Sequence, residues 1–247
     1  MKKYCAVMIA SSLLLAGNAL AEEEKAAEKS PWTNTAELGF IRTTGNTETQ
    51  TSALKVDVIY EVDKWRHTGH ADGYGSSSED DAGNNIVSAE RYELSGKSDY
   101  KFTELDYIFG LIKFKDDRFS GFEYENTITA GYGRKVIKQD DMELDLEIGP
   151  GVRFFKVDDS VSDEEAILRL AGKYWWQITD NSKFTQDLSF DIGEEITSTE
   201  SITGIQANIN STLALKFTYT IRNKSEVPAA TTEKTDTELA MTLVYTM

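Results

Sequence analysis

The sequence predicts an all-β protein: a single transmembrane antiparallel up-and-down β-barrel of about 12 strands, preceded by a cleaved signal peptide. Three observations predict it. Polar and apolar residues alternate from Asn34 onward in segments of roughly ten residues, the pattern of membrane barrel strands. The N-terminus has the features of an export signal, and the chain ends inside an alternating segment with no polar tail.

The closing segment runs from Thr235 to Met247, and its two faces differ in polarity. One face is largely apolar and carries Thr237, Leu239, Met241, Leu243, Tyr245 and Met247. The other is more polar and carries Asp236, Glu238, Ala240, Thr242, Val244 and Thr246. A half-buried strand of a soluble protein has the same alternation. In a membrane barrel this segment would close the wall against the first strand, so that no open edge faces lipid.

The first 21 residues are interpreted as a signal peptide. Lys2 and Lys3 precede a mostly apolar stretch, residues 4–15, and the A-x-A site places cleavage between Ala21 and Glu22. A membrane anchor is the alternative, but the apolar stretch is too short to span a bilayer. Removing these 21 residues leaves 226 residues with a net charge of −18 and no cysteine. Disulfides and thiol chemistry are then excluded, and the negative charge argues against nucleic acid as a partner.

The mature chain divides into a flexible periplasmic tail, residues 22–33, and a barrel, residues 34–247. The tail is charged and has no apolar period. The expected strands are 34–42, 48–62, 65–75, 86–102, 105–115, 123–137, 142–154, 166–178, 183–192, 202–209, 213–222 and 235–247.

The connections fall into two sets. Five are short: 63–64, 103–104, 139–141, 179–182 and 210–211. Five are longer and more polar: 76–85, 116–122, 156–165, 193–201 and 223–234. Short turns on one side and long loops on the other are typical of outer-membrane barrels, although the tight turn 43–47 departs from this rule. An uninterrupted strand over 202–221 would give eleven strands. We prefer twelve, because an even number leaves both termini in the periplasm.

Aromatic residues recur near the expected strand ends, as in the interfacial girdles of membrane barrels. They are Tyr60, Trp65, Tyr100, Phe102, Tyr107, Phe154, Tyr174, Trp176, Phe184, Tyr219 and Tyr245. The core of a soluble β-sandwich would use the same residue types.

Three stretches of the sequence resemble one family. They are AELGFIRTTGNTET at 36–49, DDRFSGFEY at 116–124, and VPAATTEKTDTEL at 227–239 with the closing LVY at 243–245. Together they resemble the YdiY-like family of salt-induced outer-membrane proteins, a domain of unknown function, and the similarity covers residues 34–247. The resemblance implies a Gram-negative outer-membrane barrel and supplies no catalytic residues. Such chains usually end in an aromatic residue, whereas this one ends in Met247, with Tyr245 as the nearest ring.

The expected inner face is acidic. The acids placed there are Glu37, Asp57, Glu61, Asp72, Glu93, Asp99, Asp106, Glu123, Glu125, Glu143, Asp145, Glu147, Asp187, Asp191, Asp236 and Glu238. The bases are Lys55, Arg66, Lys97, Lys135, Arg153, Arg169, Lys173, Lys216 and Arg222. Lys135 should lie near Asp145. Rings of acids favour cations, so one hypothesis is a narrow passage for small cations. The other is a structural envelope protein whose lumen is filled by ion pairs, since twelve strands lie between filled and open barrels. A link to salt or osmotic response is implied only by the name of the family that the sequence resembles.

Other constellations of residues give weaker hypotheses. Glu143, Asp145 and Glu147 share a face and could bind calcium, but ion pairing is the simpler account. Glu79-Asp80-Asp81 and Asp163-Glu164-Glu165 are interpreted as solvated loop acids. Strand glycines are expected where the backbone bends or approaches a neighbour. We expect no cofactor and no metal.

Enzymatic activity is not expected, because a hydrolase needs a nucleophile, a histidine base and an orienting group together. The two histidines, His67 and His70, fall on opposite faces of one strand, which leaves only His70 with Asp72 as a conceivable inner site. A barrel-embedded lipid hydrolase and a secreted soluble barrel that binds a ligand remain as alternatives.

The expected partners are outer-membrane lipid and the barrel-assembly machinery, which would recognise Thr235 to Met247. The oligomeric state stays open.

Overall fold

The structure is a computed structural model that describes residues 30–43, 49–79, 84–118, 120–157, 160–228 and 233–247. The predicted cleavage site at Ala21 and Glu22, most of the tail, the 43–47 turn beyond Thr43, and Asp80-Asp81 lie outside these ranges. The strands are β1 (Trp32–Thr43), β2 (Thr49–Val62), β3 (Trp65–Glu79), β4 (Asn85–Lys101), β5 (Asp106–Asp117), β6 (Phe122–Lys138), β7 (Met142–Val157), β8 (Ser162–Thr179), β9 (Ser182–Gly193), β10 (Thr197–Asn208), β11 (Leu213–Lys224) and β12 (Thr235–Thr246).

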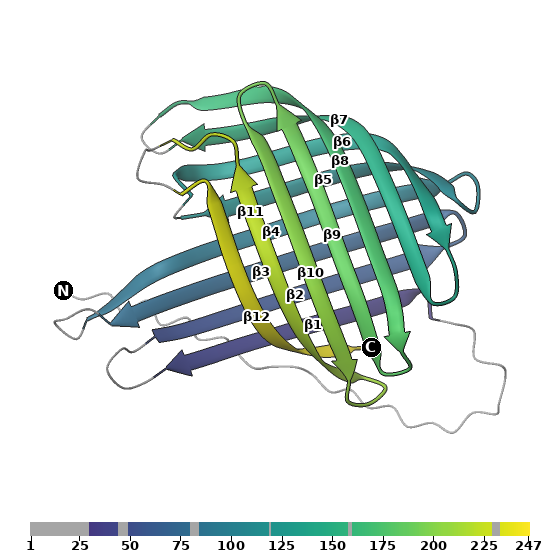
Figure 1. Cartoon of the computed structure of the whole chain (residues 1–247). Coiled ribbons are helices and arrows are strands. Elements are labelled where there is room, and N and C mark those ends of the chain that lie inside the picture. The colour runs from purple at the N-terminus through teal and green to yellow at the C-terminus, as the bar shows by residue number, and fades with distance from the viewer. Residues whose placement is uncertain (1–29, 44–48, 80–83, 119, 158–159, 229–232) are drawn as a thin grey trace. The chain divides into compact units, whose positions relative to one another are not determined.

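The twelve strands form one closed barrel in which each strand pairs antiparallel with its neighbours in sequence, and β12 pairs with β1 (Figure 1). The predicted antiparallel up-and-down β-barrel is therefore confirmed, including the break between β10 and β11 that gives twelve strands rather than eleven. The connections β2–β3, β4–β5, β6–β7, β8–β9 and β10–β11, each of two to four residues, lie at one end of the barrel, which we call the turn end. The opposite end, which holds the β11–β12 connection, is the loop end. Asp63 makes the β2–β3 turn with a left-handed φ of 51°, a conformation that Asp tolerates better than most residues.

Strands are longer at the loop end than the sequence predicted. β3, β7, β8 and β10 all extend into segments that were expected to be loop. The contrast between short turns and long loops is therefore smaller than predicted, and the β11–β12 connection, residues 225–234, is the longest one. Composition misled here, because Thr favours strands and the low strand preference of Asp is weak and depends on context, so pairing with a neighbouring strand can override it.

The two faces of the wall have opposite character. Along β12, Leu239, Met241, Leu243 and Tyr245 face outward and are 42–73% exposed, whereas Val244 faces inward and is 2% exposed. Outward apolar side chains recur on the other strands, among them Leu38, Phe40, Leu94, Ile108 and Ile148. Such a belt, wrapped round a charged interior, is the reverse of a soluble protein and suits contact with lipid. No helix in the described ranges is long and apolar enough to cross a bilayer.

Aromatic side chains gather on the outer face at the turn end. Trp32 lies 4.5 Å from Tyr60 between ring centroids, and Trp65 lies 5.0 Å from Tyr100. These four rings sit at the ends of β1 to β4, as interfacial girdles do. The prediction was wrong for Tyr107, which faces inward and is 2% exposed.

The seam between β1 and β12 is paired over only part of its length. The ladder runs from Thr35–Thr246 to Leu38–Leu243, whereas the β1–β2 ladder spans all of β1, from Trp32 to Thr43. Toward the loop end the two strands diverge (Figure 1). The barrel is thus closed at the turn end of this seam, and the seam is its least extensive pairing.

Glycines allow close backbone approach in β6 and β7. A Cβ on Gly149 would lie 2.8 Å from the Cα of Gly131, and a Cβ on Gly131 would lie 2.7 Å from the Cα of Gly149. No larger residue fits at either position without displacing the opposite strand. The two glycines lie where the β6–β7 ladder is interrupted, between Thr129–Gly151 and Tyr132–Ile148.

Candidate functional site

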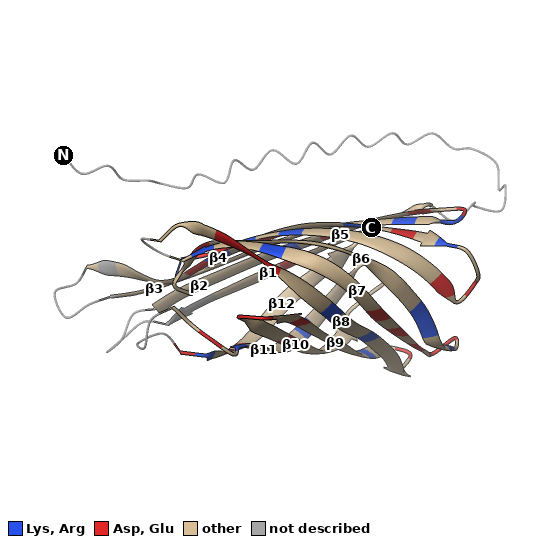
Figure 2. Ribbon diagram, turned by 90° about the horizontal axis from the view of Figure 1, so that it is seen from above, with Lys and Arg blue, Asp and Glu red and all other residues tan. Residues whose placement is uncertain are grey.

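The barrel interior is the candidate functional site. Acidic and basic residues are interspersed along the strands rather than segregated (Figure 2). Because opposite charges lie within reach of one another, most of the interior carboxylates form ion pairs, which offsets the cost of removing them from water. The pairs fall into a group at the turn end and a group at the loop end.

The turn-end cluster consists of Arg66, Lys97, Asp99, Asp145 and Glu147. Arg66 Nε donates to Asp99 at 2.7 Å, and Arg66 Nη2 lies 3.8 Å from Asp145. Lys97 pairs with Asp99 at 3.0 Å and also with Glu147. Asp99 is 1% exposed. The cluster ties β3 and β4 to β7, which is not their neighbour in the wall, so the ion pairs cross the interior.

Three apolar residues of β5 fill the interior beside this cluster. Tyr107, Phe109 and Leu111 are 2%, 4% and 7% exposed. The hydroxyl of Tyr107 donates to Glu147 at 2.8 Å, and Arg66 and Lys97 lie 5.4 and 5.2 Å from the centre of its ring. Apolar packing and cation–π contacts therefore obstruct the lumen at this level, together with the ion pairs.

Lys135 lies near Asp145, as the sequence predicted, at 3.3 Å, and it also pairs with Glu143. The three acids considered for calcium, Glu143, Asp145 and Glu147, are each engaged by a lysine or by Tyr107. The described residues contain no group of three or more His, Cys, Asp or Glu suited to hold a metal ion. The interpretation of these acids as members of ion pairs is the one that the geometry supports.

The loop-end cluster is a chain of five alternating charges. Glu238 of β12 accepts from Arg91 of β4 and from Arg222 of β11, each at 3.1 Å. Arg91 also reaches Asp72 at 3.3 Å, and Arg222 reaches Glu200 at 2.9 Å. The cluster joins β3 and β4 to β10, β11 and β12, which lie on opposite walls of the barrel (Figure 1).

Arg153 and Glu165 form the most buried ion pair, at 2.6 Å, with side chains 2% and 5% exposed. Arg153 also donates to the backbone carbonyls of Ile196 at 2.8 Å and Asp191 at 3.0 Å. Glu165 accepts from the backbone N–H of Glu195 at 2.9 Å. The prediction that Glu165 is a solvated loop acid was wrong. β8 begins at Ser162, and strand alternation then turns Glu165 inward.

The remaining predicted charges occupy smaller groups. Their pairs are Asp57 with His70 at 2.7 Å, Lys216 with Glu37 at 2.7 Å, Arg169 with Asp191 at 2.7 Å, Glu93 with Lys113 at 3.4 Å, Glu125 with Lys224, and Glu61 with Lys101. In the ladders, Lys55 stands opposite Asp72, and Lys173 stands opposite Asp145 and Asp187. A carboxylate oxygen of Asp187 is buried without a hydrogen-bond partner. Asp236 is exposed at the rim.

Sequence reasoning missed several inward charges, mostly bases. They are Arg91, Lys101, Lys113, Lys115, Lys183, Lys224, Glu165 and Glu200. Two predicted acids are not inside: Asp106 pairs with Arg134 on the outer face, and Glu123, beside a bulge, is half exposed and pairs with Lys156. The interior is consequently close to charge balance, and the prediction of an acidic lumen was wrong.

The error on β5 has one cause. Placing Asp106 inward turned Tyr107, Lys113 and Lys115 outward, because a shift of one residue exchanges the two faces of a strand. The apolar residues Ile108, Ile112 and Phe114 share the face of Asp106 and are 44–53% exposed. Their spacing was the signal that fixes the correct face. Arg91 and Lys101 share the parity of Lys97 on β4 and could have been found from it.

The two histidines lie on opposite faces, as predicted. His70 bonds to Asp57 inside the barrel, rather than to Asp72. His67 lies on the outer face, where its Nδ1 is 2.8 Å from Ser98 Oγ and its ring stacks on Trp65. No carboxylate is bonded to His67 among the described residues, so the pair lacks the orienting group of a hydrolytic triad.

Comparison with known proteins gives a family and a fold. The chain is 32% identical to the uncharacterized protein YdiY of Escherichia coli (strain K12), over 98% of this chain and 96% of that one. The COG4313 outer membrane channel from Pseudomonas putida F1 superposes with a TM-score of 0.51 and 10% identity, over 93% of this chain and all of that one. The translocator domain of the autotransporter NalP from Neisseria meningitidis gives 0.49 and 12%, over 87% and 86%. Residues 36–247 match the model of the family described as protein of unknown function, DUF481, and the chain therefore belongs to this family.

Proposed function

We propose that the protein is a non-enzymatic integral barrel of the Gram-negative outer membrane, with both termini in the periplasm. Its interior is closed at rest by ion pairs and passes only small ions. The outward apolar belt and the turn-end aromatic rings support the membrane location. In this arrangement β12 carries the segment that the assembly machinery recognises.

One observation carries the proposal: ion pairs join strands on opposite walls. Arg91 meets Glu238 across three intervening strands, and Lys224 meets Glu125 across four. Lys97 meets Glu147 across two. An open cylinder of twelve strands would hold these partners apart, so their contact requires walls that lie close together. Access of hydrated ions then depends on how often the pairs open. Because salt weakens ion pairs, conductance should rise more steeply than in proportion to salt concentration.

Single-channel recording in planar bilayers tests the proposal, with Tyr107→Ala and Tyr219→Ala as matched variants. Tyr107 obstructs the lumen, whereas Tyr219 is 45% exposed on the outer face. We expect small, rare openings in the wild type, a larger conductance in Tyr107→Ala, and no change in Tyr219→Ala. A steady, wide-pore conductance in the wild type, or identical currents in all three proteins, would contradict a closed lumen.

The same recordings measure charge preference. An acidic lumen would favour cations, but the bases found inside nearly balance the acids. We therefore expect weak selection between potassium and chloride. Lipid hydrolysis is the competing function, and the His67–Ser98 contact is the observation in its favour. Lipid turnover by purified protein that is lost in Ser98→Ala would establish hydrolysis and overturn the non-enzymatic proposal.

A further inference from the structure

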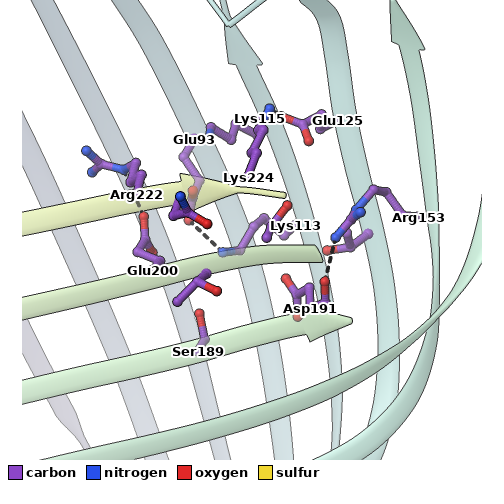
Figure 3. A pocket seen from close by; sticks show the side chains of 14 residues that line it. Glu93, Lys113, Lys115, Glu125, Arg153, Ser189, Asp191, Glu200, Arg222 and Lys224 are labelled. Carbon is purple, nitrogen blue, oxygen red and sulfur yellow. Dashed lines mark hydrogen bonds and ion pairs between the residues drawn. The ribbon is translucent and has the colours of Figure 1, made fainter. Parts of the chain in front are cut away.

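A cavity of about 70 Å³ lies inside the barrel at its loop end (Figure 3). It is lined from β4, β5, β6, β7, β9, β10 and β11, near the ends that lead to the loop-end connections. Room of this size accommodates a few water molecules or a small polar ligand. Five bases and four acids line it, so positive charge exceeds negative charge by one.

The four acids are already neutralised by other side chains. Glu93 pairs with Lys113 at 3.4 Å, and Glu125 pairs with Lys224. Asp191 pairs with Arg169 at 2.7 Å, and Glu200 pairs with Arg222 at 2.9 Å.

Three of the five lining bases belong to these pairs, and a fourth, Arg153, is paired with Glu165, just outside the cavity. The fifth lining base is Lys115. Lys115 stands in the ladders between Glu93 and Glu125, each of which is ion-paired to another lysine. Among the described residues no carboxylate forms an ion pair with Lys115. Glu125 and Glu200 lie near enough to attract Lys115 electrostatically, but each is already ion-paired to another base. A bound anion would give this half-buried ammonium a direct partner and so offset the cost of its burial.

The remaining lining supplies neutral hydrogen-bonding groups. The hydroxyls of Thr127, Ser189 and Ser198 border the same cavity, whereas the amide of Asn223 already donates to Lys234 and Thr235. Hydroxyl and amide groups donate to oxyanions, and an ammonium strengthens such binding through charge-assisted hydrogen bonds. A metal cation is a poor candidate, because every lining acid already has a basic partner.

We propose that this cavity binds a small oxyanion, a carboxylate or a phosphate, with Lys115 as the cation that engages it. The site requires no conduction through the barrel, so it can be assayed in detergent without a membrane. Failure of binding and failure of the proposed passage are therefore separate results.

Isothermal titration of the detergent-solubilised full chain with acetate, inorganic phosphate and acetamide, at fixed ionic strength in chloride, tests the proposal. Acetamide has the shape of acetate without its charge. We expect saturable binding of acetate or phosphate and none of acetamide. Comparing the two anions identifies which oxyanion the site prefers.

Lys115→Gln should weaken binding about tenfold, as expected for loss of one charge-assisted contact, and Lys115→Arg should largely retain it. Lys173→Gln is the matched control: it removes the same charge from the turn-end half of the lumen and leaves the cavity intact. Equal losses in Lys115→Gln and Lys173→Gln would show a general effect of charge, and unchanged binding in Lys115→Gln would show a different site. Either result, or no saturable binding in the wild type, overturns the proposal.

Discussion

Arg91 of β4 donates to Glu238 of β12 at 3.1 Å, although β1, β2 and β3 lie between these strands in the wall. The contact shows that the two walls approach each other at the loop end. The charge of Glu238 is neutralised by Arg91 and Arg222 together, and Arg91 also forms an ion pair with Asp72. Removing one partner of an interior ion pair would therefore leave a charge unpaired and would also release a contact that crosses the lumen.

Arg91→Met should destabilise the barrel, because Asp72 loses its ion pair and Glu238 keeps only the one with Arg222. We expect the free energy of unfolding in urea, followed by tryptophan fluorescence, to fall by about 1–3 kcal/mol. The control is Lys138→Met. Lys138 pairs with Glu104 at an exposed turn, where an ion pair contributes less than about 1 kcal/mol. Equal losses in the two variants would show that the cross-barrel contact has no special role.

Arg153→Met should have a larger effect, about 3–5 kcal/mol, because it leaves the buried carboxylate of Glu165 without its partner. The double variant Arg153→Met/Glu165→Gln should regain part of that loss, since no buried charge then stays unpaired. The urea midpoints of the two single variants and the double variant give the coupling directly. Additive losses would mean that the two side chains act independently.

Gly133→Ala should be destabilising, by about 1–3 kcal/mol, because a Cβ there would collide with the ring of Tyr107 and come within 2.7 Å of its hydroxyl oxygen. The ring must then leave Glu147. Gly110→Ala is the matched control on β5, where nothing lies within 4 Å of the added methyl group. Thermal unfolding by circular dichroism should separate the two; a tolerated Gly133→Ala would mean that Tyr107 is not packed as described.

The partly paired seam can be tested with cysteines, because residues 34–247 contain none of their own. A Leu38→Cys/Leu243→Cys pair lies in the β1–β12 ladder and should form a disulfide quickly under mild oxidation. A Phe40→Cys/Met241→Cys pair lies just beyond the ladder and should cross-link slowly and incompletely. Gel mobility under non-reducing conditions reports both. Equally rapid cross-linking of the two pairs would show that the seam is closed along its full length.

Much of the fold could be predicted from the sequence because strand alternation is a local property. The clearest cases are β7, with Asp145 inside and Leu146 outside, and β11, with Phe217 outside. In both strands apolar residues occupy every second position over most of the strand, so only one assignment of the outer face is possible. The β10–β11 break followed from the requirement for an even number of strands. Where two parities competed, as on β5, a single charged residue at the strand start was given more weight than the apolar spacing behind it.

By itself, the sequence determined the class of fold and which face of most strands is apolar, since each depends on residues near one another in the chain. It left eleven or twelve strands open, and the structure decided for twelve. The tertiary structure alone decided which charges meet across the lumen, how far the walls approach each other, and that β1 and β12 pair over part of their length. These features depend on the curvature of the closed wall. Curvature places residues such as Arg91 and Glu238, far apart in sequence, within hydrogen-bonding distance, and no local pattern encodes it.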